Sequence, residues 1–83
     1  MNFTETELKL ARFFTEREGD GILEELRSID FMESGIIDSL DLVSLAVFIE
    51  RNFQVKIDLA DPTTFAAARR FDSLMALING SVK

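Results

Sequence analysis

The sequence predicts an all-α protein built from four helices. Helix-start signals precede apolar residues at helical spacing in four places along the chain. The alternating polar and apolar stretch at 54–58 could be extended, but it is too short to make a sheet. Because the 83 residues include no cysteine, helix packing must supply the stability that disulfides provide in many small proteins. A chain of this size suits one domain, spanning 1–83.

The first helix is predicted from a capping box. Thr4 and Glu7 have the spacing at which two side chains satisfy the free amides of a first helical turn. Phe3 and Leu8 have the spacing of a hydrophobic staple, and the helix should end near 17–19. Its predicted core face consists of Leu8, Ala11 and either Phe14 or Thr15.

A long connection is expected between Gly19 and Gly35, where helical periodicity weakens. Leu23, Leu26 and Phe31 are its predicted anchors to the core, and a single helical turn could interrupt it. Because a loop of this length is unusual in a small domain, it suggests a functional role.

The second helix should begin at Asp38 and run to about Phe53. Asp38 is a good N-cap residue, Ser39 then takes the first helical position, and Asp41 complements the positive end of the helix dipole. The helix has more apolar residues than one buried face requires, so either most of it is buried or part of it contacts a partner. The predicted stripe facing the first helix comprises Leu40, Val43, Ala46 or Val47, Ile49 and Phe53.

Two shorter helices follow. Asp61 and Pro62 form a strong helix start, with aspartate as the cap and proline at the first position, so a short helix is predicted over 63–69. The last helix is predicted to begin with Asp72 as its cap and to end at Asn79 and Gly80.

The net charge of the chain indicates which kinds of partner it can bind. Fifteen acidic residues against nine basic ones give a formal net charge of -6, which disfavours binding to nucleic acid phosphates. Basic protein surfaces suit this charge better, although an acidic surface can also serve solubility alone.

The sequence shows no sign of membrane insertion. It has no apolar run of transmembrane length, and its first residues lack the basic-then-apolar order of a signal peptide. A cytoplasmic protein without a membrane span is expected, and we expect it to be a monomer.

Ser39 is open to three interpretations. Serine is common at helix starts because its side chain binds backbone amides, but Asp38 already supplies that cap and leaves the Ser39 hydroxyl without a structural role. A nucleophilic serine needs a base, and the chain has no histidine or cysteine. The third interpretation is modification by another enzyme, which a helix start favours when the added group carries a phosphate.

An enzymatic role is therefore not expected. A lysine could act as the base if an apolar pocket lowered its pKa. The sequence around Lys9, Lys56 and Lys83, the three lysines of the chain, indicates no such pocket. Asp38 and Asp41 are explained as helix-start acids more readily than as an acid and base pair or a metal site.

The stretch 31–53 resembles the central part of acyl and peptidyl carrier proteins, whose hallmark is an Asp-Ser-Leu triplet opening the second helix. Here that triplet is Asp38, Ser39 and Leu40, and the resemblance extends more loosely over nearly the whole chain. It implies a four-helix bundle with a long first loop and a short third helix. Further matching positions are Gly35, Asp41, Val43, Glu50 and Phe53.

The resemblance implies that a Mg-dependent phosphopantetheinyl transferase attaches 4'-phosphopantetheine from coenzyme A to Ser39. The arm would carry an acyl or aminoacyl group as a thioester between a loading ligase or synthase and later enzymes of fatty acid, polyketide or nonribosomal peptide biosynthesis. Asp38 would help present Ser39 to the transferase, and Leu40 would pack at the root of the arm.

The second helix departs from the strongly acidic one of fatty acid synthesis carriers. Ser44, Arg51 and Asn52 dilute its charge, so partner recognition should depend more on apolar contacts. This favours a freestanding carrier of a specialised pathway; the alternative is a helical interaction module without a prosthetic group. The predicted partner-binding residues are Asp41, Leu42, Val47, Phe48 and Glu50.

Overall fold

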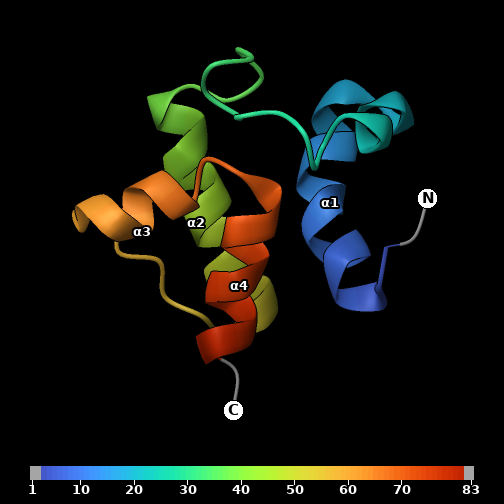
Figure 1. The fold of residues 1–83 in the computed structure, drawn as a ribbon. Helices are drawn as coiled ribbons and strands as arrows, with labels where there is room; N and C mark the ends of the chain where they lie inside the picture. The colour runs from blue at the N-terminus through green and yellow to red at the C-terminus, as the bar shows by residue number, and fades with distance from the viewer. Residues whose placement is uncertain (1–2, 82–83) are drawn as a thin grey trace.

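A computed structural model describes residues 3–81 of the chain (Figure 1). In this part the chain forms four α-helices and no strand, which confirms the all-α prediction. An isolated β-bridge joins Asp30 and Arg70. The elements in chain order are α1 (Glu5–Glu18), the short 3-10 helix η1 (Asp20–Glu24), α2 (Ser39–Phe53), α3 (Pro62–Ala67) and α4 (Phe71–Ser81).

The α1 helix starts as predicted. The Glu7 amide donates to Thr4 Oγ1 at 3.1 Å, and the Thr4 amide donates to Glu7 Oε1 at 2.8 Å, which completes the capping box. The predicted staple is wrong at Leu8, which is 48% exposed, while the Phe3 ring packs edge-on against Phe71 with centroids 5.7 Å apart. The buried residues of α1 are Leu10, Ala11 and Phe14.

Helices α1 and α2 run in opposite directions. Lys9, near the start of α1, lies over the Phe53 ring at the end of α2, 5.2 Å from its centroid. The rings of Phe13 and Phe48 are 5.5 Å apart midway along the pair. At the other end, Arg17 forms an ion pair with the first turn of α2. The end of α1 therefore lies beside the start of α2.

The predicted stripe of α2 is right at Ile49, which is buried, and at Phe53, which packs partly buried against the core. It is wrong at Leu40, which is 79% exposed, and at Val43, which is 53% exposed. The buried residues of α2 are Leu42, Leu45 and Ile49. Both sets follow helical spacing, so periodicity alone did not distinguish them. The exposed set also includes Val47, and we call Leu40, Val43 and Val47 the exposed stripe of α2.

Leu40 and Leu42 should therefore respond differently to the same truncation. Leu42→Ala is expected to lower the free energy of unfolding by about 2–5 kcal/mol, because it leaves a cavity in the core. Leu40→Ala should change it by less than about 0.5 kcal/mol, since little apolar surface is buried there. Urea unfolding of both variants checks the assignment, and equal losses would contradict it.

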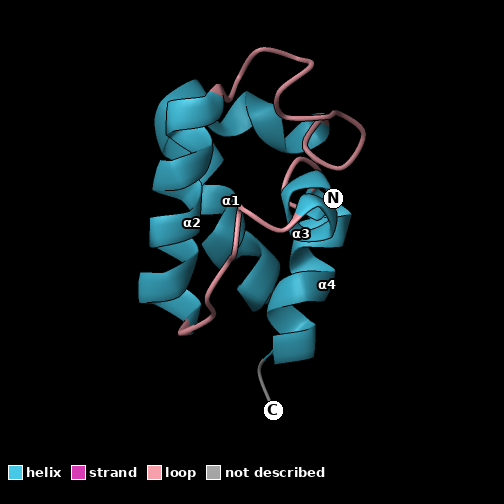
Figure 2. Ribbon diagram, turned by 90° about the vertical axis from the view of Figure 1, so that its left-hand side faces the viewer, coloured by secondary structure: helices cyan, strands magenta, loops and turns pink. Residues whose placement is uncertain are grey.

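The connection between α1 and α2 crosses one end of the molecule, at the top of both views (Figures 1 and 2). Leu26 and Phe31 anchor it as predicted, with no exposed surface, whereas Leu23 is only partly buried. The Phe31 amide donates to the Arg69 carbonyl at 2.7 Å, and the Phe31 carbonyl accepts from the Ile37 amide at 3.1 Å. These bonds attach the connection both to the segment between α3 and α4 and to the residues that lead into α2.

The last two helices lie where they were predicted, but α4 differs from its prediction in its cap and in its end. Asp61 caps α3 by accepting from the Thr63 and Thr64 amides, and Pro62 is its first residue. The prediction that Asp72 caps α4 is wrong, because Asp72 lies in the first turn and pairs with Arg27 at 2.7 Å. The helix also continues through 79–80 to Ser81 instead of ending there.

Across residues 3–81, no helix combines the length and the apolar character needed to span a bilayer.

Candidate functional site

The start of α2 is fixed by two aspartates that cap each other. The Asp41 amide donates to Asp38 Oδ1 at 2.8 Å, and the Asp38 amide donates to Asp41 Oδ2 at 3.3 Å. Asp38 has extended backbone angles and is the N-cap, as predicted. This reciprocal cap contains the pair of side chains that flank Ser39 and Leu40 in the sequence, so neither aspartate needs help from the serine to begin the helix.

The approach to α2 is held by a turn and an apolar anchor. Gly35 has φ of +85°, a left-handed conformation that side chains disfavour, and its amide donates to the Met32 carbonyl at 3.2 Å. Ile37 is buried and bonded to Phe31 through its amide. With Ile37 on one side and buried Leu42 on the other, the position of the helix start is set by the core.

Ser39 occupies the first position of α2 and is exposed. Within residues 3–81 its hydroxyl takes part in no hydrogen bond, and the amides of Ser39 and Leu40 are likewise without a partner. The site thus presents one accessible hydroxyl beside two free amides at the positive end of a 15-residue helix. A phosphate ester at this oxygen could accept from those amides.

Arg17 is a residue of the site that the sequence did not reveal. Its Nη2 lies 2.8 Å from Asp41 Oδ1, and its guanidinium lies over the Phe13 ring. Asp41 therefore binds the Asp38 amide and Arg17 at the same time. In the sequence, a basic residue in the last turn of α1 is explained by the helix dipole alone. Nothing near Arg17 in the sequence therefore indicated a contact with a residue 24 positions away.

These contacts lower the pKa of Asp41 below its ordinary value of 3.8. The hydrogen bond from the Asp38 amide is the main cause; slight desolvation opposes it, and Arg17 adds to the lowering. A carboxyl with a depressed folded-state pKa stabilises the fold above its unfolded pKa. That stabilisation is lost as the pH falls from about 3.8 through the lower folded value.

We expect Asp41→Asn to be less stable than the wild type near neutral pH. The difference should shrink as the pH falls through this acidic window, because the wild-type carboxyl is then protonated as well. Urea unfolding at a series of pH values measures it. Glu50→Gln is the control, since Glu50 is exposed on the same helix and its side chain has no ion-pair or hydrogen-bond partner in residues 3–81. A constant difference for Asp41→Asn across the window would contradict the assignment.

The predicted partner-binding residues divide by burial. Val47 is 44% exposed and Glu50 is exposed, so both are open to a partner. Leu42 is 1% exposed, which shows that its prediction as a contact residue was wrong. Phe48 is partly buried against Phe13, and Asp41 is engaged by Arg17.

No lysine within residues 3–81 lies at the end of α2 that carries Ser39. Lys9 lies at the opposite end of α2, about 20 Å away for a helix of this length, and Lys56 follows that same end. Lys83 lies outside the described residues. No group of three or more histidine, cysteine, aspartate or glutamate side chains suited to a metal ion is present within 3–81. The described side chains thus give no support to a serine nucleophile activated by a lysine of this chain.

Comparison of the chain with protein-family models, with curated proteins and with solved structures found no match.

Proposed function

We propose that this protein is a carrier that holds an acyl or aminoacyl group as a thioester on a 4'-phosphopantetheine arm attached to Ser39. The observation that carries the proposal is the exposed, unbonded Ser39 hydroxyl at the first position of α2. Asp38 and Asp41 cap the helix without it, and buried Ile37 and Leu42 hold the helix start in place. A serine with this placement is available to another enzyme and dispensable to the fold.

Attachment of the arm is a phosphoryl transfer carried out by a separate transferase. Ser39 Oγ attacks the pantetheine-bearing phosphorus of coenzyme A, forming a new P–O bond, and the pyrophosphate P–O bond breaks. Adenosine 3',5'-bisphosphate leaves, and the serine proton passes to a base of the transferase. This chain contributes the nucleophilic oxygen and its rigid presentation, while Mg and the base come from the enzyme.

The residues around Ser39 fit the attached phosphodiester. Its negative charge would lie near the free amides of Ser39 and Leu40, where the helix dipole also favours it. Asp38 and Asp41 bring negative charge to the same turn, but Asp41 is already paired with Arg17. When bound, the arm supplies the thiol that forms the thioester, since the chain has no cysteine.

The exposed stripe of α2 is the proposed contact for partner enzymes. Leu40, Val43 and Val47 lie at intervals of three and four residues and follow directly on Ser39. They form an apolar surface that begins at the attachment residue, with Glu50 available at its far end. The four helices and the long connection between α1 and α2 agree with the bundle that the carrier resemblance implies.

The proposal is tested by loading. We expect the folded protein, incubated with coenzyme A, Mg and a promiscuous phosphopantetheinyl transferase, to gain the mass of one phosphopantetheine group. Ser44→Ala, which removes another exposed serine of α2, should gain the same mass. If the folded wild type gains no mass, the carrier proposal fails. The exposed stripe of α2 would then favour an interaction module without a prosthetic group.

A further inference from the structure

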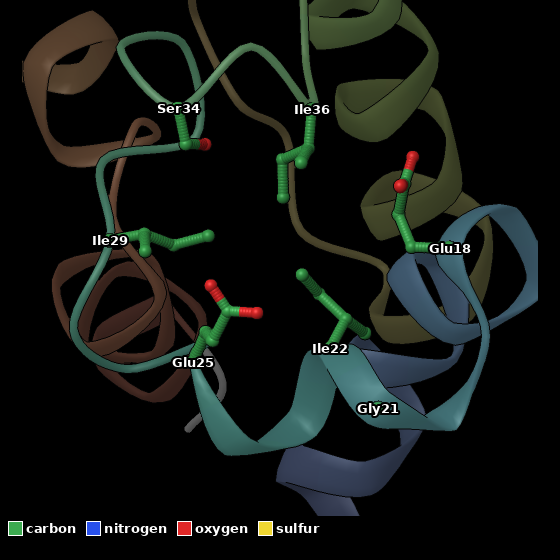
Figure 3. A pocket seen from close by; sticks show the side chains of 7 residues that line it. All are labelled: Glu18, Gly21, Ile22, Glu25, Ile29, Ser34 and Ile36. Atoms are coloured by element: carbon green, nitrogen blue, oxygen red, sulfur yellow. The ribbon is translucent and has the colours of Figure 1, made fainter.

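A pocket of about 390 Å³ lies between the end of α1, η1 and the connection that leads into α2. Figure 3 shows the side chains of Ile22, Ile29 and Ile36 pointing toward its centre from different segments. Ile22 is buried, whereas Ile29 and Ile36 are only partly buried. The exposed apolar surface of Ile29 and Ile36 can therefore contact a small bound group. The volume is at the lower end of the range of about 300–1,000 Å³ that is typical of ligand sites.

Two carboxylates adjoin this apolar surface. The Glu25 side chain points into the same space from the position just after η1, and Glu18 lies at its edge at the end of α1 (Figure 3); both residues are exposed. Neither has an ion-pair or hydrogen-bond partner for its side chain within residues 3–81. The lining includes no lysine or arginine, and Arg17 is paired with Asp41. The pocket therefore combines three isoleucine side chains with two carboxylates and has no basic side chain in its lining.

We propose that this pocket binds an aliphatic group that carries a primary ammonium, and that its occupant is an aminoacyl cargo on the arm of Ser39. The alkyl part would contact Ile22, Ile29 and Ile36, and the ammonium would lie against Glu25, whose carboxylate points into the pocket, with Glu18 at the rim. An acyl group without a charge leaves both carboxylates unpaired, and an acidic cargo is repelled by them. The naming of the cargo rests on the proposed function, but the pocket's preference for cations does not.

The place of the pocket suits a tethered ligand. Ile36 is three residues before Ser39, so their Cα atoms are at most about 11 Å apart. A small and partly open pocket should bind a free amine weakly, because few atoms make contact. A cargo attached through a short flexible arm has an effective concentration in the millimolar range, which is enough to occupy a weak site.

The pocket is tested first on the unmodified protein with butylammonium as the probe. Amide chemical shifts of Ile22, Ile29 and Ile36 should move together and saturate during the titration. Methylammonium should bind about tenfold more weakly, because it lacks the alkyl chain that the isoleucines contact. Butyrate, which has the chain but the opposite charge, should cause no saturable change.

Charge variants assign the contribution of the carboxylates. Glu25→Gln should weaken butylammonium binding about fivefold, the effect of removing one charge at close range in a water-exposed site. Glu24→Gln is the matched control, since Glu24 is the neighbouring residue of η1 and is exposed outside the pocket. An equal effect of both variants would show only general attraction to an acidic protein and would overturn the proposal.

The cargo is tested by loading Ser39 with two arms of equal size, one ending in β-alanyl and one in butanoyl. We expect the pocket amides to shift with the β-alanyl arm and this shift to shrink in Glu25→Gln, whereas the butanoyl arm shifts them clearly less. Equal shifts with both arms, or none with either, would overturn the assignment of the cargo. Failure to load either arm would count against the proposed function instead, and the butylammonium titration still decides the pocket.

Discussion

Phe31→Ala is expected to lower the free energy of unfolding by about 3–5 kcal/mol. Phe31 has no exposed surface, and its ring centroid lies 4.4 Å from that of Phe14 on α1. Its backbone also joins the connection to Arg69 and Ile37, so a cavity here loosens the segment that leads into the site. A domain of this size has a total stability of roughly 4–12 kcal/mol, so this variant should lose a large share of it.

Phe13→Ala is the matched control, because it removes the same side chain from a partly buried position on α1. Phe13→Ala should lower the free energy of unfolding clearly less than Phe31→Ala does. Urea unfolding followed by circular dichroism measures both variants. A loss below about 1 kcal/mol for Phe31→Ala would show that the connection does not depend on its anchor.

Ser39→Ala is expected to abolish loading and leave the fold intact. The hydroxyl makes no hydrogen bond in the described part of the chain and its residue is exposed, so the free energy of unfolding should change by less than about 0.5 kcal/mol. Intact mass after incubation with the transferase should show no phosphopantetheine at all. The two results together separate a modified serine from a structural one.

Asp38→Ala is the control for Ser39→Ala, because it removes a side chain that does stabilise the start of α2. Its side chain accepts from the Asp41 amide at 2.8 Å, so its loss should cost about 1 kcal/mol of stability. Substantial destabilisation by Ser39→Ala, comparable with that of Asp38→Ala, would mean that the serine helps to cap α2 after all.

Local signals were enough to predict where α1, α2 and α3 begin. Thr4 with Glu7, Asp38 with Ser39, and Asp61 with Pro62 act through side chains that bind nearby amides or through a fixed φ, and all three starts are found. These interactions involve residues within one turn, so the sequence contains all the information they need.

Tertiary contacts decided what the local pattern left open. Leu40 and Leu42 head two apolar sets on α2 with the same helical spacing, and only packing against the rest of the molecule makes Leu42 the buried one. Arg17 reaches Asp41 because α1 and α2 run in opposite directions, and the pocket brings Ile22 beside Ile36 across a folded connection. None of these neighbours is close in sequence, so periodicity and capping could not predict them.

The attachment site is located most directly by fragmenting the loaded wild-type protein and finding the added group by tandem mass spectrometry. We predict one phosphopantetheine on the peptide that contains Ser39, attached to that residue. A folded protein that gains no such group, or gains it on Ser34 or Ser44 instead, would contradict the assignment of Ser39 as the attachment site.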